Sequence, residues 1–151
     1  MEKRFATRPV RLRDLDRILR IEVASFGADA YDRNLFAEYT RKCGGLFLVA
    51  TWGTKVVAYS IAAVSPTRPG RAELVSIAVD PEFLGKGGAA ALMDSTLRRL
   101  RRRRVARFGL MVKVTNRRAL AFYAKYGFRR LRRVPSYYED GADGLALALD
   151  L

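Results

Sequence analysis

The chain of 151 residues contains no histidine and only one cysteine, Cys43. A zinc site of the usual His and Cys ligands, or a nucleophile activated by histidine, therefore cannot be assembled, and no internal disulfide can form. Long apolar runs are also lacking, because stretches such as 45–51 and 56–64 fall far short of the roughly 20 residues of a membrane span. These absences argue against a metalloenzyme, a hydrolase with a histidine base, and a membrane protein.

The first residues, Met1 to Arg4, lead directly into an alternating segment with no apolar leader sequence behind them. We therefore predict a cytoplasmic protein. Half of the residues are hydrophobic, which is enough for one sizeable core. The length and composition predict a single domain over residues 1–151.

Positive charge is in excess, with 29 Lys and Arg against 15 Asp and Glu, a formal net charge of +14. Such a chain attracts polyanions, for example a nucleotide cofactor, ribosomal RNA or acidic protein tails. Arginine is concentrated in two runs, 98–104 and 129–133. A ribosome or an acidic protein could dock there if the runs share a face; the alternative is two solvated surfaces. We expect no sequence-specific nucleic-acid binding and no membrane partner.

Segments of alternating polarity are interspersed with segments of helical spacing, which is typical of an α/β or α+β domain. Asp14 is placed to cap the first helix, in which Leu15, Ile18, Leu19 and Val23 share one face and which ends near residues 26–27. Further helices are predicted around 35–39, from 89 to 100 and over 116–125. Strands are predicted at 5–12, 46–51, 55–64, 71–79, 107–114, 128–134 and 145–149.

A glycine-rich loop, Leu84-Gly85-Lys86-Gly87-Gly88, follows one of these strands and opens a helix. Backbone N–H groups and the positive end of the helix dipole converge at such a place. A side chain at Gly85, Gly87 or Gly88 would hold an anion away from the backbone, and Lys86 adds a cation. The loop therefore predicts a pyrophosphate site, although glycine-rich turns before helices are common.

The stretch from Ala72 to Pro81, together with this loop, resembles the acetyl-CoA motif of the GNAT superfamily of N-acetyltransferases. The core of that motif reads Gln/Arg-x-x-Gly-x-Gly/Ala, and Gly87 and Ala89 occupy its two small positions. Later segments resemble the second cofactor segment of the family and its N-terminal acetyltransferase branch: Val114-Thr115-Asn116, Ala121-Phe122-Tyr123, Tyr126-Gly127-Phe128, Ser136-Tyr137-Tyr138 and Asp140-Gly141. The chain is most similar to RimI-type ribosomal-protein alanine acetyltransferases and their archaeal relatives.

This resemblance implies an α+β fold with a mixed, mostly antiparallel sheet of about six to seven strands and about four helices. It implies acetyl-CoA as the cofactor and acetyl transfer to an amine. Tyr123 would protonate the departing CoA thiolate, and Asn116 would hydrogen-bond the pantetheine. The remaining cofactor contacts implied are Ile77, Ala78 and Val79 of the strand and Leu84, Gly85, Lys86, Gly87, Gly88 and Ala89 of the loop. Without the family pattern, Ile77, Val79 and Tyr123 would read as core residues.

The chain departs from the family pattern at three positions. Leu84 stands where Gln or Arg is usual, and Gly88 replaces an Ile or Val, which is expected to loosen the loop. Met111 stands where RimI-type enzymes commonly carry the glutamate that deprotonates the amine. Glu73, at the position of the catalytic glutamate in the histone-type branch, is our first choice of base; the alternative is a solvated strand residue paired with an arginine.

The resemblance places the acceptor mouth at Phe26 and Tyr31, in the 25–31 loop, and at Tyr137 and Tyr138, with Glu22 as a second carboxylate nearby. An α-amine with a pKa near 8 is about 10% neutral at pH 7, whereas a lysine amine is only about 0.04% neutral. An α-amine therefore tolerates a weaker base. We expect a protein N-terminus, for example that of a ribosomal protein, as acceptor; the alternatives are a small-molecule amine, a lysine, or a non-catalytic acetyl-CoA-binding module.

Overall fold

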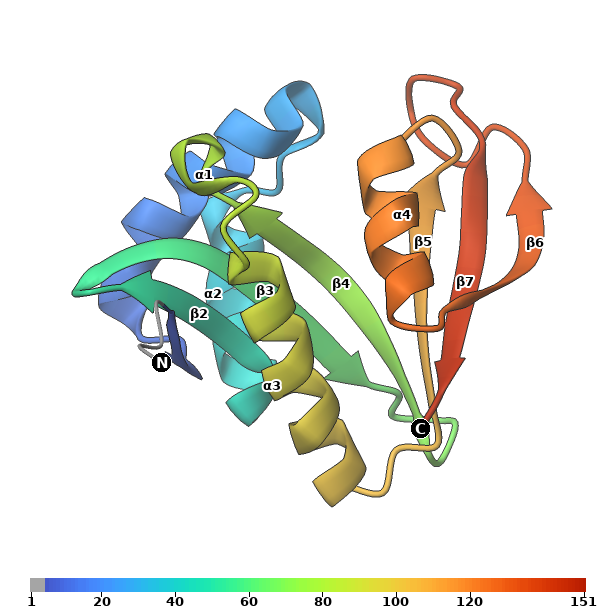
Figure 1. Ribbon diagram of the computed structural model, residues 1–151, viewed down its shortest axis with the longest axis horizontal. Helices are drawn as coiled ribbons and strands as arrows, with labels where there is room; N and C mark the ends of the chain where they lie inside the picture. The colour runs from blue at the N-terminus through green and yellow to red at the C-terminus, as the bar shows by residue number, and fades with distance from the viewer. Residues whose placement is uncertain (1–4) are drawn as a thin grey trace. The chain divides into compact units, whose positions relative to one another are not determined.

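The computed structural model describes residues 5–151 and contains, within them, seven strands and four α-helices (Figure 1). The helices are α1 Leu15–Phe26, α2 Arg33–Lys42, α3 Gly88–Arg102 and α4 Arg117–Lys125. The strands are β1 Ala6–Pro9, β2 Phe47–Trp52, β3 Lys55–Val64, β4 Arg71–Val79, β5 Arg107–Lys113, β6 Arg129–Val134 and β7 Gly144–Asp150. Short 3-10 turns lie at η1 Leu12–Asp14, η2 Gly27–Asp29, η3 Gly44–Leu46 and η4 Pro81–Phe83.

The strands form one mixed sheet in the order β1-β2-β3-β4-β5-β7-β6. Strand β4 pairs with β5 in parallel register, with Glu73 opposite Gly109. The pairs β1·β2, β2·β3, β5·β7 and β6·β7 are antiparallel. The α+β fold with a mixed, mostly antiparallel sheet and four helices is thus confirmed.

The chain divides into two compact units, which are described separately below. The first unit comprises the chain up to Ala63 together with Val75–Arg103, and so holds β1 to β3, the end of β4 and helices α1 to α3. The second unit comprises Val64–Leu74 and Arg104–Leu151, and so holds the start of β4, β5 to β7 and α4.

Among residues 5–151, no helix is both long enough and apolar enough to cross a membrane.

The core of the first unit is built on β2 and β3, whose residues are buried almost without interruption. Figure 1 shows α3 in front of these strands and α1 behind them. Because both faces of the strands are covered, their sequences read as continuous apolar runs and do not alternate. Leu48, Ala50 and Ala58 from the strands and Leu92 from α3 form a fully buried cluster.

The second unit places α4 against β5 and β7, and β6 at the edge of the sheet. Phe108 and Phe128 pack with their ring centroids 6.0 Å apart, and Phe128 also contacts Tyr123 at 5.5 Å. The residues of β6 are almost all exposed. Charged residues on an exposed edge strand discourage pairing with the sheet of another molecule, so the arginines of β6 have a structural explanation.

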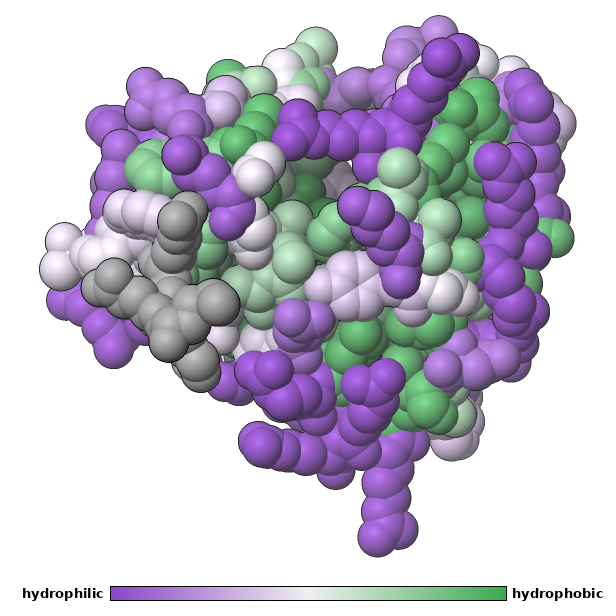
Figure 2. Space-filling view, in the orientation of Figure 1, coloured by the Kyte–Doolittle hydropathy of each residue, from purple (hydrophilic) through white to green (hydrophobic). Residues whose placement is uncertain are grey.

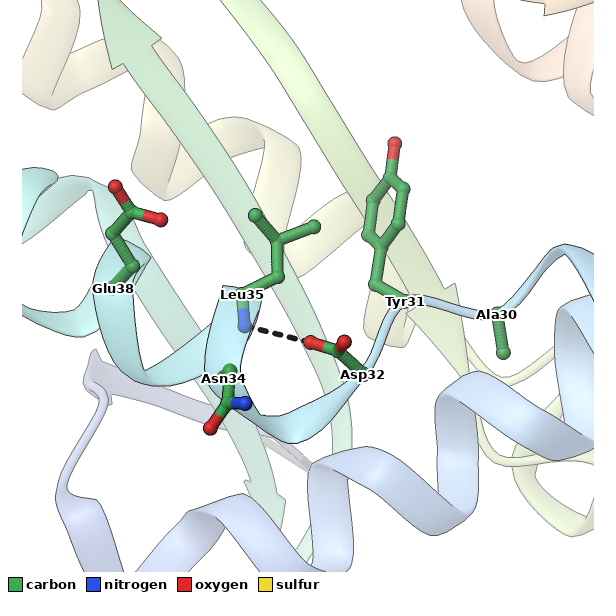
Figure 3. Close-up of a pocket in the computed structure, with 6 residues that line it drawn as sticks. All are labelled: Ala30, Tyr31, Asp32, Asn34, Leu35 and Glu38. Carbon is green, nitrogen blue, oxygen red and sulfur yellow. Dashed lines mark hydrogen bonds between the residues drawn. The ribbon is translucent and has the colours of Figure 1, made fainter.

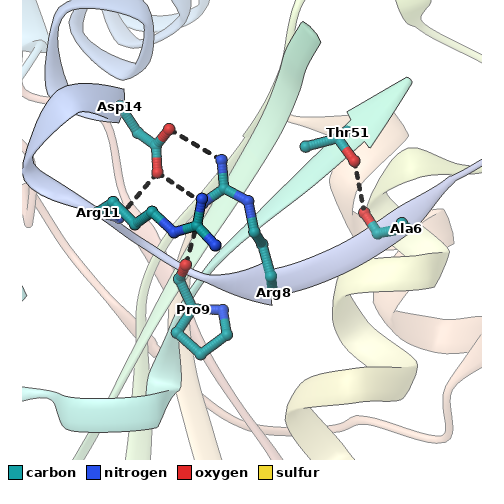
Figure 4. A network of polar contacts seen from close by, with 6 residues as sticks. All are labelled: Ala6, Arg8, Pro9, Arg11, Asp14 and Thr51. Carbon is teal, nitrogen blue, oxygen red and sulfur yellow. Dashed lines mark hydrogen bonds and ion pairs between the residues drawn. The ribbon is translucent and has the colours of Figure 1, made fainter. Parts of the chain in front are cut away.

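The start of the chain differs from its prediction. We expected a strand over 5–12 and a side-chain cap by Asp14, but β1 ends at Pro9 and Asp14 makes no cap hydrogen bond to α1. Instead its buried carboxylate accepts hydrogen bonds from Arg8 Nη1 and Nη2, at 2.8 and 3.0 Å, and from the Arg11 amide at 2.8 Å (Figure 4). Burial alone would raise the pKa of Asp14, but Arg8 and the Arg11 amide hold it below its ordinary value.

The buried face of α1 also differs from its prediction. Leu15 and Ile18 are buried as expected, but Val23 is 58% exposed and Leu19 only half-buried. Ile21 and Glu22 take the inward positions in their place. A buried glutamate is rare unless it is paired, so the apolar pattern led us to expect Leu19 and Val23, and not Ile21 and Glu22, on the buried face.

Candidate functional site

The glycine-rich loop lies between β4 and α3 in the first unit. The Asp80 amide, directly after β4, donates to the Val57 carbonyl at 2.8 Å, which fixes the start of the loop to β3. Gly85 and Gly87 have φ values of +77° and +100°, in the left-handed region that favours glycine. The exposed loop then enters α3 at Gly88, where the first amides of a helix lack partners within that helix. This geometry can present backbone N–H groups to an anion.

An ion pair anchors the same loop to α1. The Arg17 guanidinium bonds the Asp80 carboxylate and also donates, through Nε, to the Val56 carbonyl at 2.9 Å. Asp80 also accepts from the Glu82 amide at 3.0 Å, so its side chain caps the η4 turn. Burial would raise the pKa of Asp80, but these two donors hold it below its ordinary value. No local sequence pattern indicates this anchor, because its two residues lie 63 positions apart.

Gly88, expected to loosen the loop, is instead buried. A Cβ atom at Gly88 would lie 3.4 Å from the Phe5 ring and 3.8 Å from Ala58 Cβ. Phe5 in turn packs edge-on against Trp52 at 5.1 Å, and Trp52 contacts Phe83 of η4 at 5.9 Å. An aromatic side chain from another part of the chain therefore fills the space beside Gly88.

Ile77 and Val79 of β4 turn their side chains toward the apolar cluster that contains Leu92, and Ala78 is buried. The side chains of Ile77 and Val79 are thus partly buried against the core. Their backbone groups, which the resemblance assigns to the cofactor, are not tested by these contacts. Beyond them, Leu84 is 44% exposed on the loop, and Lys86 is exposed beside it.

Glu22 lies at the centre of a buried polar network in the first unit, with only 1% of its surface exposed. Its carboxylate accepts from the Tyr31 amide at 2.9 Å and from the Tyr59 hydroxyl, which lies 3.2 Å from the Ser76 hydroxyl. Burial raises the pKa of Glu22, and the hydrogen bonds from Tyr31 and Ser76 only partly oppose this rise. The network ties α1, the following loop, β3 and β4 together.

Phe26 and Tyr31, the first predicted pair of the acceptor mouth, lie at the two ends of the short segment between α1 and α2, and both are partly exposed. The Tyr31 ring packs against Phe36 with centroids 6.2 Å apart. An open depression beside this ring is lined by Ala30, Tyr31, Asp32, Asn34, Leu35 and Glu38 (Figure 3). Among the lining residues, Asp32 caps α2, because its carboxylate accepts a hydrogen bond from the Leu35 amide at 2.9 Å.

Tyr123 and Asn116 belong to the second unit. Tyr123 is buried on α4 between Phe122 and Phe128, and burial, with a smaller effect of Tyr138, raises its pKa well above the ordinary value. The hydroxyl stays protonated at neutral pH. Asn116 is the N-cap of α4, and its Oδ1 accepts from the Ala119 amide at 3.1 Å. Its NH2 group therefore remains to donate a hydrogen bond to a ligand.

Tyr137 and Tyr138, the second predicted pair, lie on the loop between β6 and β7 with their rings 5.0 Å apart. Lys113 holds this loop, because its ammonium lies 5.1 Å from the centre of the Tyr138 ring and pairs with Asp140 at 2.9 Å. Tyr138 makes the smaller of the two contributions that raise the pKa of Tyr123.

The remaining predicted residue of this unit, Glu73, is exposed on β4 directly opposite Gly109 of β5. It lies among the three residues at which these two strands pair in parallel. No other predicted site residue of the second unit has a contact with Glu73 that would assign it a task, so its role stays a prediction.

The sequence matches the model of the Acetyltransferase (GNAT) family over residues 12–128. The chain belongs to this family. It is 29% identical to an N-alpha-acetyltransferase of Saccharolobus solfataricus, over 97% of this chain and 93% of the relative. It is 27% identical to a putative ribosomal protein bS18-alanine N-acetyltransferase of Bacillus subtilis, over 97% and 96%. The structure of Ard1 from Thermoplasma volcanium matches with a TM-score of 0.93 at 26% identity, covering 99% of both chains.

As a GNAT family member, the protein is an acetyl-CoA-dependent N-acetyltransferase. One departure from the family pattern, Met111 of β5, has a clear structural setting. A Cβ at Gly144 would lie 2.9 Å from the Met111 sulfur and 3.2 Å from Tyr137 Cβ, so both side chains lie close to the backbone at the start of β7. Met111 cannot replace the usual glutamate, because a thioether does not accept the proton of an amine.

Proposed function

We propose that this protein transfers the acetyl group of acetyl-CoA to the α-amino group of a protein N-terminus. The observation that carries the proposal is the glycine-rich loop at the end of β4. It is supported by the similarity of almost the whole chain to an N-alpha-acetyltransferase. We also propose that the chain forms a single acetyltransferase domain, because the family model spans residues 12–128 without interruption. Ribosomal-protein N-termini form one acceptor class to test, because a relative is named for bS18.

The loop from Leu84 to Ala89 would hold the pyrophosphate through backbone amides, with Lys86 as an added cation. Backbone groups of Ile77 to Val79 would bind the pantetheine arm and the acetyl carbonyl, while the side chains of Ile77 and Val79 pack in part against the apolar cluster. Asn116 would donate to the pantetheine through its NH2 group. Phe26, Tyr31, Tyr137 and Tyr138 would contact the first residues of the peptide.

The transfer is direct. The neutral amine attacks the thioester carbon, the carbon–sulfur bond breaks, and Tyr123 gives its proton to the departing thiolate while the amine proton goes to a base. Cys43 is an unsuitable acyl carrier, because it is buried and burial raises the pKa of its thiol. An intermediate on the enzyme is therefore not needed.

Glu73 is the proposed base, because it is exposed and Met111 cannot serve. Glu22 is too deeply buried to touch a substrate. Since about a tenth of an α-amine is already neutral at pH 7, the loss of Glu73 should cost only roughly 10-fold in kcat/KM, and the cost should shrink as pH rises toward 8.

The test is acetyl-CoA-dependent thiol release with peptides beginning Ala, Ser, Met-Glu or Met-Leu, next to N-blocked lysine peptides and polyamines. The wild type is compared with Glu73→Gln and Tyr123→Phe, and with the control variants Glu38→Gln and Tyr126→Phe. Turnover on free N-termini that falls only in the first two variants supports the proposal.

Two results would contradict it. Faster turnover on lysine peptides or polyamines would assign a different acceptor, and acetyl-CoA binding without turnover on any amine would leave a cofactor-binding module. A Glu73→Gln variant that loses no activity across pH 6–8 would refute the proposed base alone.

A further inference from the structure

The two arginine-rich runs of this chain differ in the structure in a way that their sequences do not show. On β6, Arg129 pairs with Asp150 at 2.9 Å and Arg133 with Asp143 at 2.7 Å. Arg107 of the neighbouring β5 also reaches Asp150, at 3.3 Å. Two of the four β6 arginines are thus neutralised by carboxylates of the same unit.

The run at the end of α3 has no such partners. Within residues 5–151, no carboxylate lies at ion-pair distance from Arg98, Arg99, Arg101, Arg102 or Arg103. Within the described part of the chain, these guanidinium groups donate a single hydrogen bond to the protein. It runs from Arg99 Nη1 to the Gly45 carbonyl, at 3.0 Å. All of these arginines except the half-buried Arg99 are exposed.

The end of α2 adds positive charge at the same place. The turn η3 follows α2, and a Cβ at Gly44 would lie 3.9 Å from Arg103 Nη2. The positive charges of Lys42 and Arg103 both oppose the rise in the pKa of the Cys43 thiol, so the ends of the two helices adjoin. We call this cluster the α2–α3 basic patch; it consists of Arg41, Lys42, Arg98, Arg99, Arg101, Arg102 and Arg103. Figure 2 shows hydrophilic side chains projecting at the lower end of α3.

Helix dipoles account for only part of this charge. The C-terminus of a helix carries roughly half a negative charge, so two helix ends offset about one of the seven cations. Glu38 offsets one more, through its ion pair with Lys42. About five positive charges therefore remain. Successive residues of a helix are about 100° apart, so Arg98, Arg99, Arg101 and Arg102 spread over about half of its circumference while Leu97 and Leu100 face the core.

We propose that the α2–α3 basic patch binds the phosphate backbone of structured RNA, independently of base sequence. The guanidinium groups are spread over the ends of two helices, so they can contact phosphates on both sides of a groove. The two backbones of an RNA duplex present phosphates in this way. An extended acidic peptide would instead need a single row of cations. Guanidinium groups also match phosphate in geometry, because they donate two parallel hydrogen bonds.

The experiment measures fluorescence anisotropy of a labelled RNA duplex of about 16 base pairs, titrated with the full chain at KCl concentrations between about 50 and 200 mM. The test variant is the triple substitution Arg98→Gln, Arg101→Gln and Arg102→Gln. The control is Arg68→Gln, Arg130→Gln and Arg132→Gln, which removes the same net charge from exposed positions of the second unit. Acetyl transfer to a short peptide and the circular dichroism spectrum report whether each variant is folded.

Each phosphate contact contributes about 0.7–0.9 to the slope of log K against log salt concentration, so the test variant should lower the slope by roughly 2–3. Its affinity at 100 mM KCl should fall about 30-fold or more, whereas the control should lose less than about 3-fold. Equal losses in both variants would show an effect of net charge only and overturn the proposal. Tighter binding of polyglutamate or of anionic vesicles than of RNA would overturn it as well.

The peptide assay separates this proposal from the proposed function, because RNA binding is measured without acetyl-CoA. A chain that binds RNA through the patch but acetylates no N-terminus would refute the enzyme assignment alone. A test variant that acetylates peptides normally and still binds RNA like the wild type would refute the RNA assignment alone.

Discussion

The two units of the molecule use polar side chains in different ways. In the first unit, buried or half-buried groups join distant elements, as in the Arg17–Asp80 pair and the network of Glu22, Tyr59 and Ser76. In the second unit, the ion pairs are exposed and join neighbouring strands and loops, as between Arg133 and Asp143. Because an unsatisfied polar group costs most where water is excluded, the first unit should depend on its polar residues for stability and the second should not.

The largest effect is expected from Glu22→Ala. The substitution leaves the Tyr31 amide and the Tyr59 hydroxyl without their acceptor in a buried site, so the free energy of unfolding should fall by roughly 2–4 kcal/mol. Urea denaturation followed by circular dichroism measures this change. A loss below about 0.5 kcal/mol would remove the basis of the comparison.

A matched pair of tyrosines tests whether the two units differ in function as well. Tyr59→Phe removes a donor to Glu22 and should lower the free energy of unfolding by roughly 1–2 kcal/mol. The Tyr123 hydroxyl has no hydrogen-bond partner within residues 5–151, so Tyr123→Phe should leave stability nearly unchanged. If Tyr123 is the acid for the thiolate, the same change should lower kcat roughly 100-fold.

The contrast between these variants is read from parallel denaturation curves and steady-state kinetics. A Tyr123→Phe variant that is strongly destabilised, or a Tyr59→Phe variant as stable as the wild type, would contradict the division of roles.

A smaller effect should appear in the pH dependence of stability. Burial raises the pKa of Glu22 above its ordinary value of 4.5, so the folded state holds this proton more tightly than the unfolded state does. The resulting stabilisation is complete below pH 4.5 and is lost as pH rises from there through the folded-state pKa. Glu22→Gln cannot ionise, so the stability of the wild type relative to this variant should decline over that window. A constant difference from pH 4 to pH 8 would show that the carboxylate is not penalised by burial.

The smallest effect is expected from Asp143→Asn in the second unit. Asp143 accepts from Arg133 at 2.7 Å and from the Ser136 amide at 2.8 Å, and these donors lower its pKa, but the site is open to solvent. Exposed ion pairs contribute little, so the melting temperature should change by less than roughly 2 °C, and salt should reduce the change further. A shift as large as that of Tyr59→Phe would break the comparison between the units.

Most of the elements could be predicted from the sequence because their patterns are local. Strand β3 was predicted with its observed bounds, and the glycine-rich loop with its following helix lies where the sequence placed it. Asn116 was placed at the start of α4, where its side chain caps the helix. Each of these features depends on residues within a few positions of one another, through alternation, backbone freedom at glycine, or capping.

The errors concern residues whose partners are distant in sequence. Glu22 was expected as a second carboxylate near the acceptor mouth, but it is buried, and Tyr59 and Ser76, far away in sequence, supply its polar surroundings. At Gly88, the sequence could not indicate that the Phe5 ring lies beside it, because the two residues are far apart in the chain. Which of the two arginine runs is neutralised likewise depends on tertiary structure, because Asp143 and Asp150 pair with arginines of β6.

The sequence by itself determined the family, the acetyl-CoA chemistry and the position of the glycine-rich loop, because each is encoded by a short ordered motif. The tertiary structure alone decided which polar groups are buried, which cations are neutralised, and that Met111 and Tyr137 both lie beside Gly144. Burial and ion pairing depend on distances between residues far apart in the chain, and no local pattern contains those distances.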